Sequence, residues 1–303
     1  MTDPTCTLAL DIGATKIAYA LVPDNAPTTT LSTGRLGTKE GDSPIEQIRL
    51  VLLAGLKAAE EHGLSVARIG MGAPGVILGP EGTIVYNGET LTEWAGTDLR
   101  GLSREVLNVP FAAHNDVRVW AYGEHHLGTG KDLTGRVLYV SLGTGVGGAI
   151  IEDGIMMSSP TGTAGEFAEV VCSDHAGLAV RCENVASGTG LTRYYNEAAA
   201  TQLDLPAIME RFHQGDGLAQ QIITGNLRGF GQALGALVTV LDLSAVVVGG
   251  GVAGIGAPVM DPITAGIFDR VLTPNKSVQV LSTSLGAQAA VIAAAKYARD
   301  NAF

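Results

Sequence analysis

The sequence contains one pattern twice, and this repetition limits the folds open to the chain more than any other feature. The stretches "TLALDIGATKIAYALV" (residues 7–22) and "RVLYVSLGTGVGGAIIEDG" (residues 136–154) each read as an apolar run, a glycine-containing turn and a second apolar run. Apolar runs on both sides of a short turn are typical of a β-hairpin. At 303 residues the chain is long enough for two cores. We therefore expect two lobes of similar topology.

Helical segments alternate with the predicted strands. A capping box from Ser43 to Glu46, with proline at the first helical position and Gly63 as C-cap, predicts a helix over about residues 44–62. The stretch "DVRVWAYGEHHLG" predicts a second helix, which ends at Gly128, whereas "RIGMGAPGVI" and "SAVVVGGGVAG" read as strands that run into turns. This alternation indicates an α/β fold with ligands held at strand ends.

Composition excludes several classes of protein. The net charge of −11 and the pI near 4.9 argue against a surface that neutralises many phosphates, so we expect no nucleic-acid partner. The three cysteines form no disulfide framework, and the N-terminus "MTDPTC" lacks the features of a signal peptide. The longest apolar stretch is broken by glycines, Asp242 and Ser244, so we expect no membrane span and a cytoplasmic protein.

The two glycine turns are candidates for phosphate binding. Glycine permits positive φ and lets backbone N–H groups approach an anion closely. A single turn of this kind is more simply explained as an ordinary hairpin turn. Two turns in matching places favour the alternative that both bind one polyphosphate.

The chain resembles the ROK family (repressor, open reading frame, kinase). The resemblance covers about residues 8–295 and is carried by an ordered set of motifs, namely "DIGATKIAYAL", "GAPGVI", "HND", "SLGTGVGGAIIEDG", "GEFAEV", "ENVASG" and "VVVGGGV". It implies the actin-like ATPase (ribonuclease H-like) fold, with two similar lobes and a cleft for nucleotide and sugar, and commonly a homodimer. We expect one lobe to comprise residues 1–112 and 285–303, with a returning C-terminal helix, and the other residues 113–284.

The resemblance also implies an ATP site with Mg²⁺. Asp11 would position Mg²⁺, usually through water, and backbone amides would meet phosphate oxygens. The motif matches assign Asp11, Gly13, Ala14, Thr15 and Lys16 to the first phosphate turn, Gly143, Thr144 and Gly145 to the second, and Gly249, Gly250 and Gly251 to the turn against the adenosine. Ala14 stands where the family commonly has a second glycine. Close helix–strand packing is the alternative explanation for the last three glycines.

Asp116 is the candidate catalytic base. It follows a predicted strand and begins a predicted helix, so an N-cap is the structural alternative. In the family the matching aspartate accepts the proton of the sugar 6-hydroxyl while that oxygen attacks the γ-phosphoryl group. The expected substrate-binding residues are Gly75, Asn115, Asp116, Glu166, Glu169 and Glu183, although each glutamate could also be an ordinary solvated acid.

Two departures from the family pattern concern the sugar and zinc sites. The family usually reads Gly-Glu-Ile-Gly-His where this chain has "GEFAE", so Glu169 replaces a histidine that touches sugar and structural zinc. The family's Cys-x-Cys-Gly-x-x-Gly-Cys loop is also missing, and we expect no structural zinc. A substitute site from Glu169, Cys172, His175 and Cys182 is the chemical alternative.

The additional carboxylate suggests an amino sugar. Carboxylates crowded into one pocket require protons or a cation, and a substrate ammonium, as in kanosamine (3-amino-3-deoxyglucose) or glucosamine, would supply the charge. Two alternatives remain open. Glu169 could point outward, or Arg118 could neutralise the acids, unless Arg118 is a surface residue of the helix.

The favoured function is therefore an ATP-dependent hexose 6-kinase, with plain glucokinase as the alternative and with ATP and polyphosphate both open as donors. A sugar-sensing ROK regulator is disfavoured because only ten residues precede Asp11, which we expect leaves no room for a DNA-binding domain. A binding-only pseudokinase would more naturally have lost the first glycine turn or Asp116, and both are present.

Overall fold

The computed structural model describes residues 4–40, 43–87, 91, 93–157 and 159–303. Internal contacts divide the chain into two compact units. Unit 1 consists of Met1–Lys131, Ser158–Thr163 and Ser284–Phe303, and unit 2 of Asp132–Met157 and Ala164–Thr283. No helix in the described part of the chain has an apolar stretch long enough to cross a membrane.

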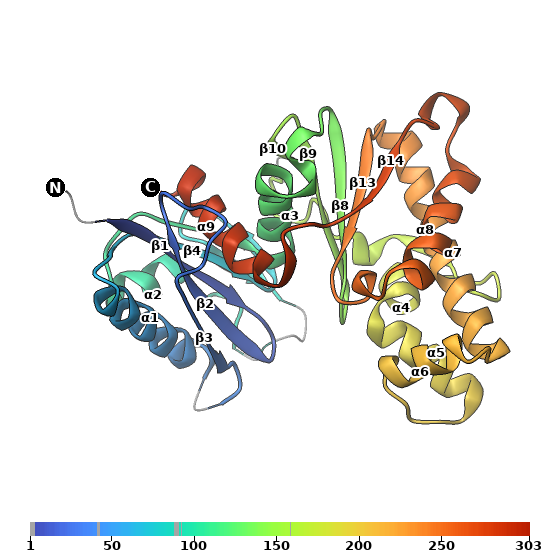
Figure 1. Cartoon of the computed structure of the whole chain (residues 1–303), viewed down its shortest axis with the longest axis horizontal. Coiled ribbons are helices and arrows are strands. Elements are labelled where there is room, and N and C mark those ends of the chain that lie inside the picture. Colours follow the sequence, from blue (N-terminus) through green and yellow to red (C-terminus); the bar gives the residue numbers. More distant parts are fainter. Residues whose placement is uncertain (1–3, 41–42, 88–90, 92, 158) are drawn as a thin grey trace. The chain divides into compact units, whose positions relative to one another are not determined.

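Unit 1 contains a five-stranded sheet in the order β3-β2-β1-β4-β7 (Figure 1). Strands β1, β2 and β3 are antiparallel neighbours, and β4 and β7 continue the sheet in parallel with β1. The sheet strands are β1 (Thr5–Ile12), β2 (Lys16–Pro23), β3 (Ser32–Gly37), β4 (Ser65–Ala73) and β7 (Phe111–Asn115), and a small hairpin is formed by β5 (Val76–Leu78) and β6 (Thr83–Tyr86). The predicted hairpin of residues 7–22 is thus confirmed as β1–β2.

Helices cover both faces of this sheet. They are α1 (Pro44–Glu61), α2 (Leu99–Val106), α3 (Asp116–Leu127) and α9 (Ala289–Asn301), with short 3-10 turns at Thr129–Asp132 and Gly286–Gln288. The predicted helix over residues 44–62 is confirmed: the Ser43 hydroxyl accepts a hydrogen bond from the Glu46 N–H at 3.2 Å, and Gly63 follows with a φ of 64°.

Side-chain size differs between the two faces of the unit 1 sheet. Because side chains alternate along a strand, Leu8 and Leu10 join one cluster with α1, whereas Ala9 joins a second cluster with the alanines of α9. Helix α9 lies so close to β4 that a Cβ atom at Gly70 would collide with the Ala294 carbonyl. Small residues therefore bring α9 onto the sheet, where it also packs against α3.

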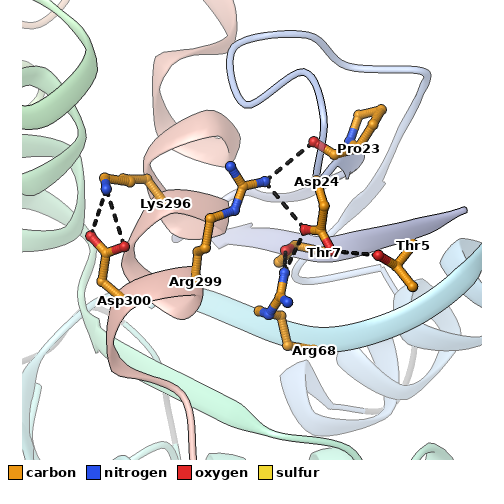
Figure 2. A network of polar contacts seen from close by, with 8 residues as sticks. All are labelled: Thr5, Thr7, Pro23, Asp24, Arg68, Lys296, Arg299 and Asp300. Carbon is orange, nitrogen blue, oxygen red and sulfur yellow. Dashed lines mark hydrogen bonds and ion pairs between the residues drawn. The ribbon is translucent and has the colours of Figure 1, made fainter.

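A polar network fastens the end of α9 to the sheet, as Figure 2 shows. Asp24 accepts hydrogen bonds from the Thr5 hydroxyl at 2.6 Å, from Arg68, and from Arg299 at 3.3 Å. Burial opposes ionisation of Asp24, but these hydrogen bonds and the two guanidinium charges outweigh it and lower its pKa. The C-terminal helix is thus held by charge as well as by packing.

The expected lobe boundary after residue 112 differs from the observed division. Strand β7 pairs with β4, and α3 packs against α9 and β4, so residues 113–131 belong to unit 1. Asp116 therefore lies in unit 1, together with the first glycine turn.

Unit 2 repeats the sheet plan of unit 1 in the order β10-β9-β8-β13-β14. An antiparallel β8–β9 hairpin is extended on one side by β10 and on the other by parallel β13 and β14. The strands are β8 (Arg136–Leu142), β9 (Val146–Glu152), β10 (Ile155–Met156), β13 (Ala245–Gly249) and β14 (Gln279–Ser282), and β11 (Val171–Ser173) and β12 (Ala179–Arg181) form a separate two-stranded sheet. The predicted second hairpin and the internal duplication are confirmed.

Five helices form most of the unit 2 core with β8 and β13 (Figure 1). They are α4 (Cys182–Ala186), α5 (Gly188–Ala199), α6 (Leu205–His213), α7 (Gly217–Leu241) and α8 (Ala257–Arg270), with 3-10 turns at Phe167–Glu169, Ala253–Ile255 and Thr273–Asn275. Helices α7 and α8 approach so closely that a Cβ atom at Gly231 would collide with the Ile263 carbonyl.

Candidate functional site

The first glycine turn joins β1 to β2 in unit 1. The Gly13 N–H donates a hydrogen bond to the Lys16 carbonyl at 2.9 Å, which closes the turn. The buried Thr38 hydroxyl donates to the Gly13 carbonyl at 2.6 Å and fixes the turn from the end of β3. Sequence reasoning missed Thr38, because its partner lies 25 residues away in the chain.

Asp11 occupies the end of β1, opposite Gly72 of β4. Burial raises the pKa of Asp11, and the Lys16 ammonium acts in the opposite direction. The residue borders a pocket of about 370 Å³ that is also lined by Lys16, Tyr19, Arg35 and Gln288. A nearby cation stabilises the ionised form of a desolvated carboxylate such as this one.

The arrangement of acidic residues in the described part of the chain limits the number of protein ligands that a magnesium ion could have. No three or more histidine, cysteine, aspartate or glutamate side chains of the described residues are arranged to hold a metal ion. Mg²⁺ usually keeps several waters and takes one or two carboxylates together with substrate phosphates. One buried carboxylate, such as that of Asp11, is compatible with this mode of binding.

Asn115 and Asp116 lie where β7 passes into α3. Asn115 is the N-cap: its Oδ1 accepts hydrogen bonds from the N–H groups of Val117 at 3.1 Å and Arg118 at 3.2 Å. Asp116 is the first helical residue, and its own Oδ1 accepts from the Val117 N–H at 2.9 Å. The alternative in which Asp116 serves as the N-cap is thus wrong. The Asp116 carboxylate instead lies at the positive end of the helix dipole.

Gly75 is joined directly to this pair. The Asn115 Nδ2 group donates a hydrogen bond to the Gly75 carbonyl at 3.1 Å. Gly75 has a φ of 103°, and a Cβ atom there would lie 2.5 Å from the Tyr86 carbonyl oxygen, so only glycine fits. Three of the predicted sugar-binding residues, Gly75, Asn115 and Asp116, therefore lie together in unit 1.

His114 and Arg118 flank the pair. Burial, assisted by the Arg118 charge, lowers the pKa of His114 to about 4, and its Nδ1 accepts a hydrogen bond from the Asn115 N–H at 2.7 Å. Both observations describe a neutral imidazole. Arg118 is only 2% exposed and donates to the Gly162 carbonyl, so it is no surface residue of the helix.

The second glycine turn joins β8 to β9 in unit 2. The Gly143 N–H donates to the Gly145 carbonyl at 3.0 Å, and the Gly188 N–H, at the start of α5, donates to the Gly143 carbonyl at 2.8 Å. Glu183 also holds the turn, because its Oε2 accepts a hydrogen bond from the Val146 N–H at 3.1 Å. Glu183 is thus a structural partner of the turn rather than a purely solvated acid.

The same turn borders an open pocket of about 740 Å³. Its lining includes Gly143, Thr144, Gly188, Thr189, Gly251 and Val252. Gly250 has a φ of 91°, and a Cβ atom there would collide with the Leu142 carbonyl, so close packing accounts for this glycine while Gly251 faces the pocket. The start of α5 was missed from the sequence, although Ser187 is a recognisable N-cap before it.

Glu169 is balanced by an arginine that sequence reasoning missed. The Arg181 guanidinium lies 2.7 Å from a Glu169 carboxylate oxygen and 3.5 Å from Glu183 Oε1. The Glu169 side chain is 66% exposed. The predicted positive partner of these acids is therefore present in the protein itself. Glu166 immediately precedes the 3-10 turn Phe167–Glu169, of which Glu169 is the last residue.

The four residues weighed as a substitute zinc site do not converge, within the residues that the structure describes. His175 contacts Asn226, Cys182 donates to the Phe167 carbonyl at 2.7 Å, and burial raises the pKa of Cys182 to about 12. A protonated, hydrogen-bonded thiol is a poor metal ligand.

Comparisons with known proteins agree with this architecture. The sequence matches the ROK family over residues 7–301. It is 30% identical to an N-acetylmannosamine kinase of Escherichia fergusonii, over 81% of this chain and 83% of the relative, and 27% identical to a glucokinase of Streptomyces coelicolor, over 97% and 98%. The crystal structure of a ROK family glucokinase from Streptomyces griseus, in complex with glucose and AMPPNP, superposes with a TM-score of 0.78 at 30% identity and covers 97% of this chain and 99% of that one. Two units with one sheet plan, a glycine hairpin in each, and a family match over nearly the whole length lead to one conclusion: the chain belongs to the ROK family and has its actin-like ATPase fold.

Proposed function

We propose that the protein is an ATP-dependent hexose 6-kinase. The observation that carries the proposal is the pair of glycine hairpins at matching positions of two equivalent sheets, with an aspartate at the start of α3 in the unit that holds the first hairpin. The similarity to a glucokinase and to an N-acetylmannosamine kinase supports a sugar as acceptor, and the AMPPNP complex of a relative supports ATP as donor.

The proposed reaction gives a role to Asp116, to the two glycine turns, to Gly251 and to Asp11. Asp116 accepts the proton of the sugar 6-hydroxyl as that oxygen forms its bond to the γ-phosphorus, the bond from the γ-phosphorus to the β–γ bridging oxygen breaks, and ADP leaves. The residues of the two turns, Gly13 to Lys16 and Gly143 to Gly145, hold the phosphates, and Gly251 with its pocket takes the adenosine. Mg²⁺, held near Asp11, supplies charge stabilisation when it is bound.

The second part of the proposal concerns the sugar. Two carboxylates, those of Glu169 and Glu183, lie beside the Arg181 guanidinium in unit 2. Arg181 weakens the charge argument for an amino sugar but leaves a negative excess. This excess favours a hexose that carries an ammonium group, such as kanosamine or glucosamine, over neutral glucose.

A sugar panel tests the proposal. Purified protein is assayed for ADP release with Mg²⁺, with ATP or polyphosphate as donor, and with kanosamine, glucosamine, glucose and N-acetylglucosamine as acceptors. We expect ATP-dependent turnover with a higher kcat/KM for an amino sugar. Equal kcat/KM for glucose would remove the amino-sugar part, and no ADP release with any sugar would refute the kinase.

Asp116→Asn, assayed on the best sugar, tests the base. General-base catalysis contributes about 10²–10⁴-fold, so kcat should fall by that amount while KM changes little. Near-normal turnover would contradict the assignment. Glu166→Gln serves as the comparison, because loss of a binding residue should raise KM more than it lowers kcat.

We also expect a homodimer, which size-exclusion chromatography with light scattering would test.

A further inference from the structure

Arg181 stands between two acids that the proposed function assigns to the sugar. It is the last residue of β12 and immediately precedes α4. Its guanidinium is 2.7 Å from Glu169 and 3.5 Å from Glu183, and its own side chain is 44% exposed. One positive charge is therefore shared by two carboxylates.

Glu183 connects this charge to the second glycine turn. Its Oε1 faces Arg181, while its Oε2 accepts the hydrogen bond from Val146 N–H at 3.1 Å. The Oε2 atom also lies close to Gly145, because an added Cβ there would be 2.5 Å from it. The two oxygens of one carboxylate thus link the guanidinium to the hairpin.

Stability does not account for this arrangement. Ion pairs between side chains as exposed as these contribute little to folding, because water screens them and ordering the side chains costs entropy. The same pair has a large effect on local charge: without Arg181 the two glutamates would present two negative charges to a ligand, and with it they present one.

We propose that Arg181 is a specificity-determining residue, which sets the charge of the candidate sugar site and thereby its preference between cationic and neutral hexoses. The inference rests on the proposed function. Arg181 acts through Glu169 and Glu183, so it is a positioning and charge-setting residue rather than a catalytic one.

The test compares Arg181→Gln with the wild type on glucosamine and glucose. Removal of one nearby positive charge at a partly exposed site should raise the ratio of kcat/KM for glucosamine to that for glucose by about tenfold. The increase should shrink at high salt, since ions screen partly exposed charges. Arg181→Lys retains the charge and should keep a ratio close to that of the wild type.

Two further variants separate charge from structure. Glu169→Gln combined with Arg181→Gln removes one charge of each sign, so the ratio should return towards the wild-type value, which a merely structural role would not produce. Arg228→Gln is the matched control, because Arg228 is 53% exposed and paired with Asp269 at 2.8 Å in the same unit. Its ratio should not change.

The outcomes distinguish this inference from the proposed function. If the wild type phosphorylates hexoses but Arg181→Gln, melting near the wild-type temperature, shows an unchanged ratio, the role of Arg181 is refuted and the kinase assignment stands. If the wild type phosphorylates no hexose, both fall. A raised ratio that the double variant reverses supports the inference.

Discussion

Replacing Asn115 provides a sharp test of how unit 1 holds Asp116. The Asn115 side chain makes three hydrogen bonds: its Oδ1 caps α3 by accepting from two backbone N–H groups, and its Nδ2 donates to the Gly75 carbonyl. Loss of an N-cap costs about 1 kcal/mol, and loss of one further hydrogen bond about 1 kcal/mol. Asn115→Ala should therefore lower the free energy of unfolding of unit 1 by about 2 kcal/mol.

One further variant separates the cap from the bond to Gly75, and a second serves as a control. Asn115→Asp keeps an N-cap oxygen but loses the donor to Gly75, so it should cost about 1 kcal/mol. Ser43→Ala is the matched control, since Ser43 caps α1 in the same unit with one hydrogen bond, at 3.2 Å. Removal of this cap should also cost about 1 kcal/mol.

Tryptophan fluorescence reports on unit 1 alone during urea unfolding. The chain has two tryptophans, Trp94 and Trp120, and both belong to unit 1. Trp94 is 1% exposed, so its emission should change strongly when the unit opens. If Asn115→Ala cost no more than Ser43→Ala, the bond to Gly75 would contribute nothing, and the argument that one side chain joins cap and turn would be refuted.

Three further predictions concern Gly145, Glu124 and His114. Gly145→Ala should destabilise unit 2 by about 1 kcal/mol, because its methyl group displaces the Glu183 carboxylate from its hydrogen bond with the Val146 N–H, whereas Gly143→Ala, with no neighbour within 4 Å, should leave the calorimetric melting temperature unchanged. Glu124→Ala should cost about 3 kcal/mol or more in tryptophan-monitored unfolding, because this fully buried carboxylate accepts hydrogen bonds from three backbone N–H groups; a loss below about 1 kcal/mol would contradict this role. His114 has a folded-state pKa of about 4, below its ordinary value of 6.5, so the unfolded chain binds the proton first and stability falls as pH drops from about 6.5 to about 4. That loss should approach about 1.4 kcal/mol per pH unit and should be absent from His114→Gln when both are unfolded in urea at pH 7, 6 and 5.

The elements that the sequence predicted are those that local chemistry encodes. The hairpins around the two glycine turns, the capped helix α1 and the helix that ends at Gly128 follow from the spacing of apolar residues and from turn and cap residues within a few positions. The duplication could be expected because the pattern of apolar run, glycine turn and apolar run occurs twice, and similar local patterns fold into similar sheets. The ordered motifs also led to the ROK family.

The tertiary structure decided which side chains meet. Arg181 reaches Glu169 because β11 and β12 fold back on one another, and no local pattern encodes that pairing. The choice of Asn115 over Asp116 as N-cap depended on the residue at which β7 ends, and the expected lobe boundary failed because β7 pairs with β4. Periodicity along a chain reports how each segment must face water, whereas the charge and hydrogen-bond balance of a site depends on distances between segments far apart in sequence, which only the folded chain sets.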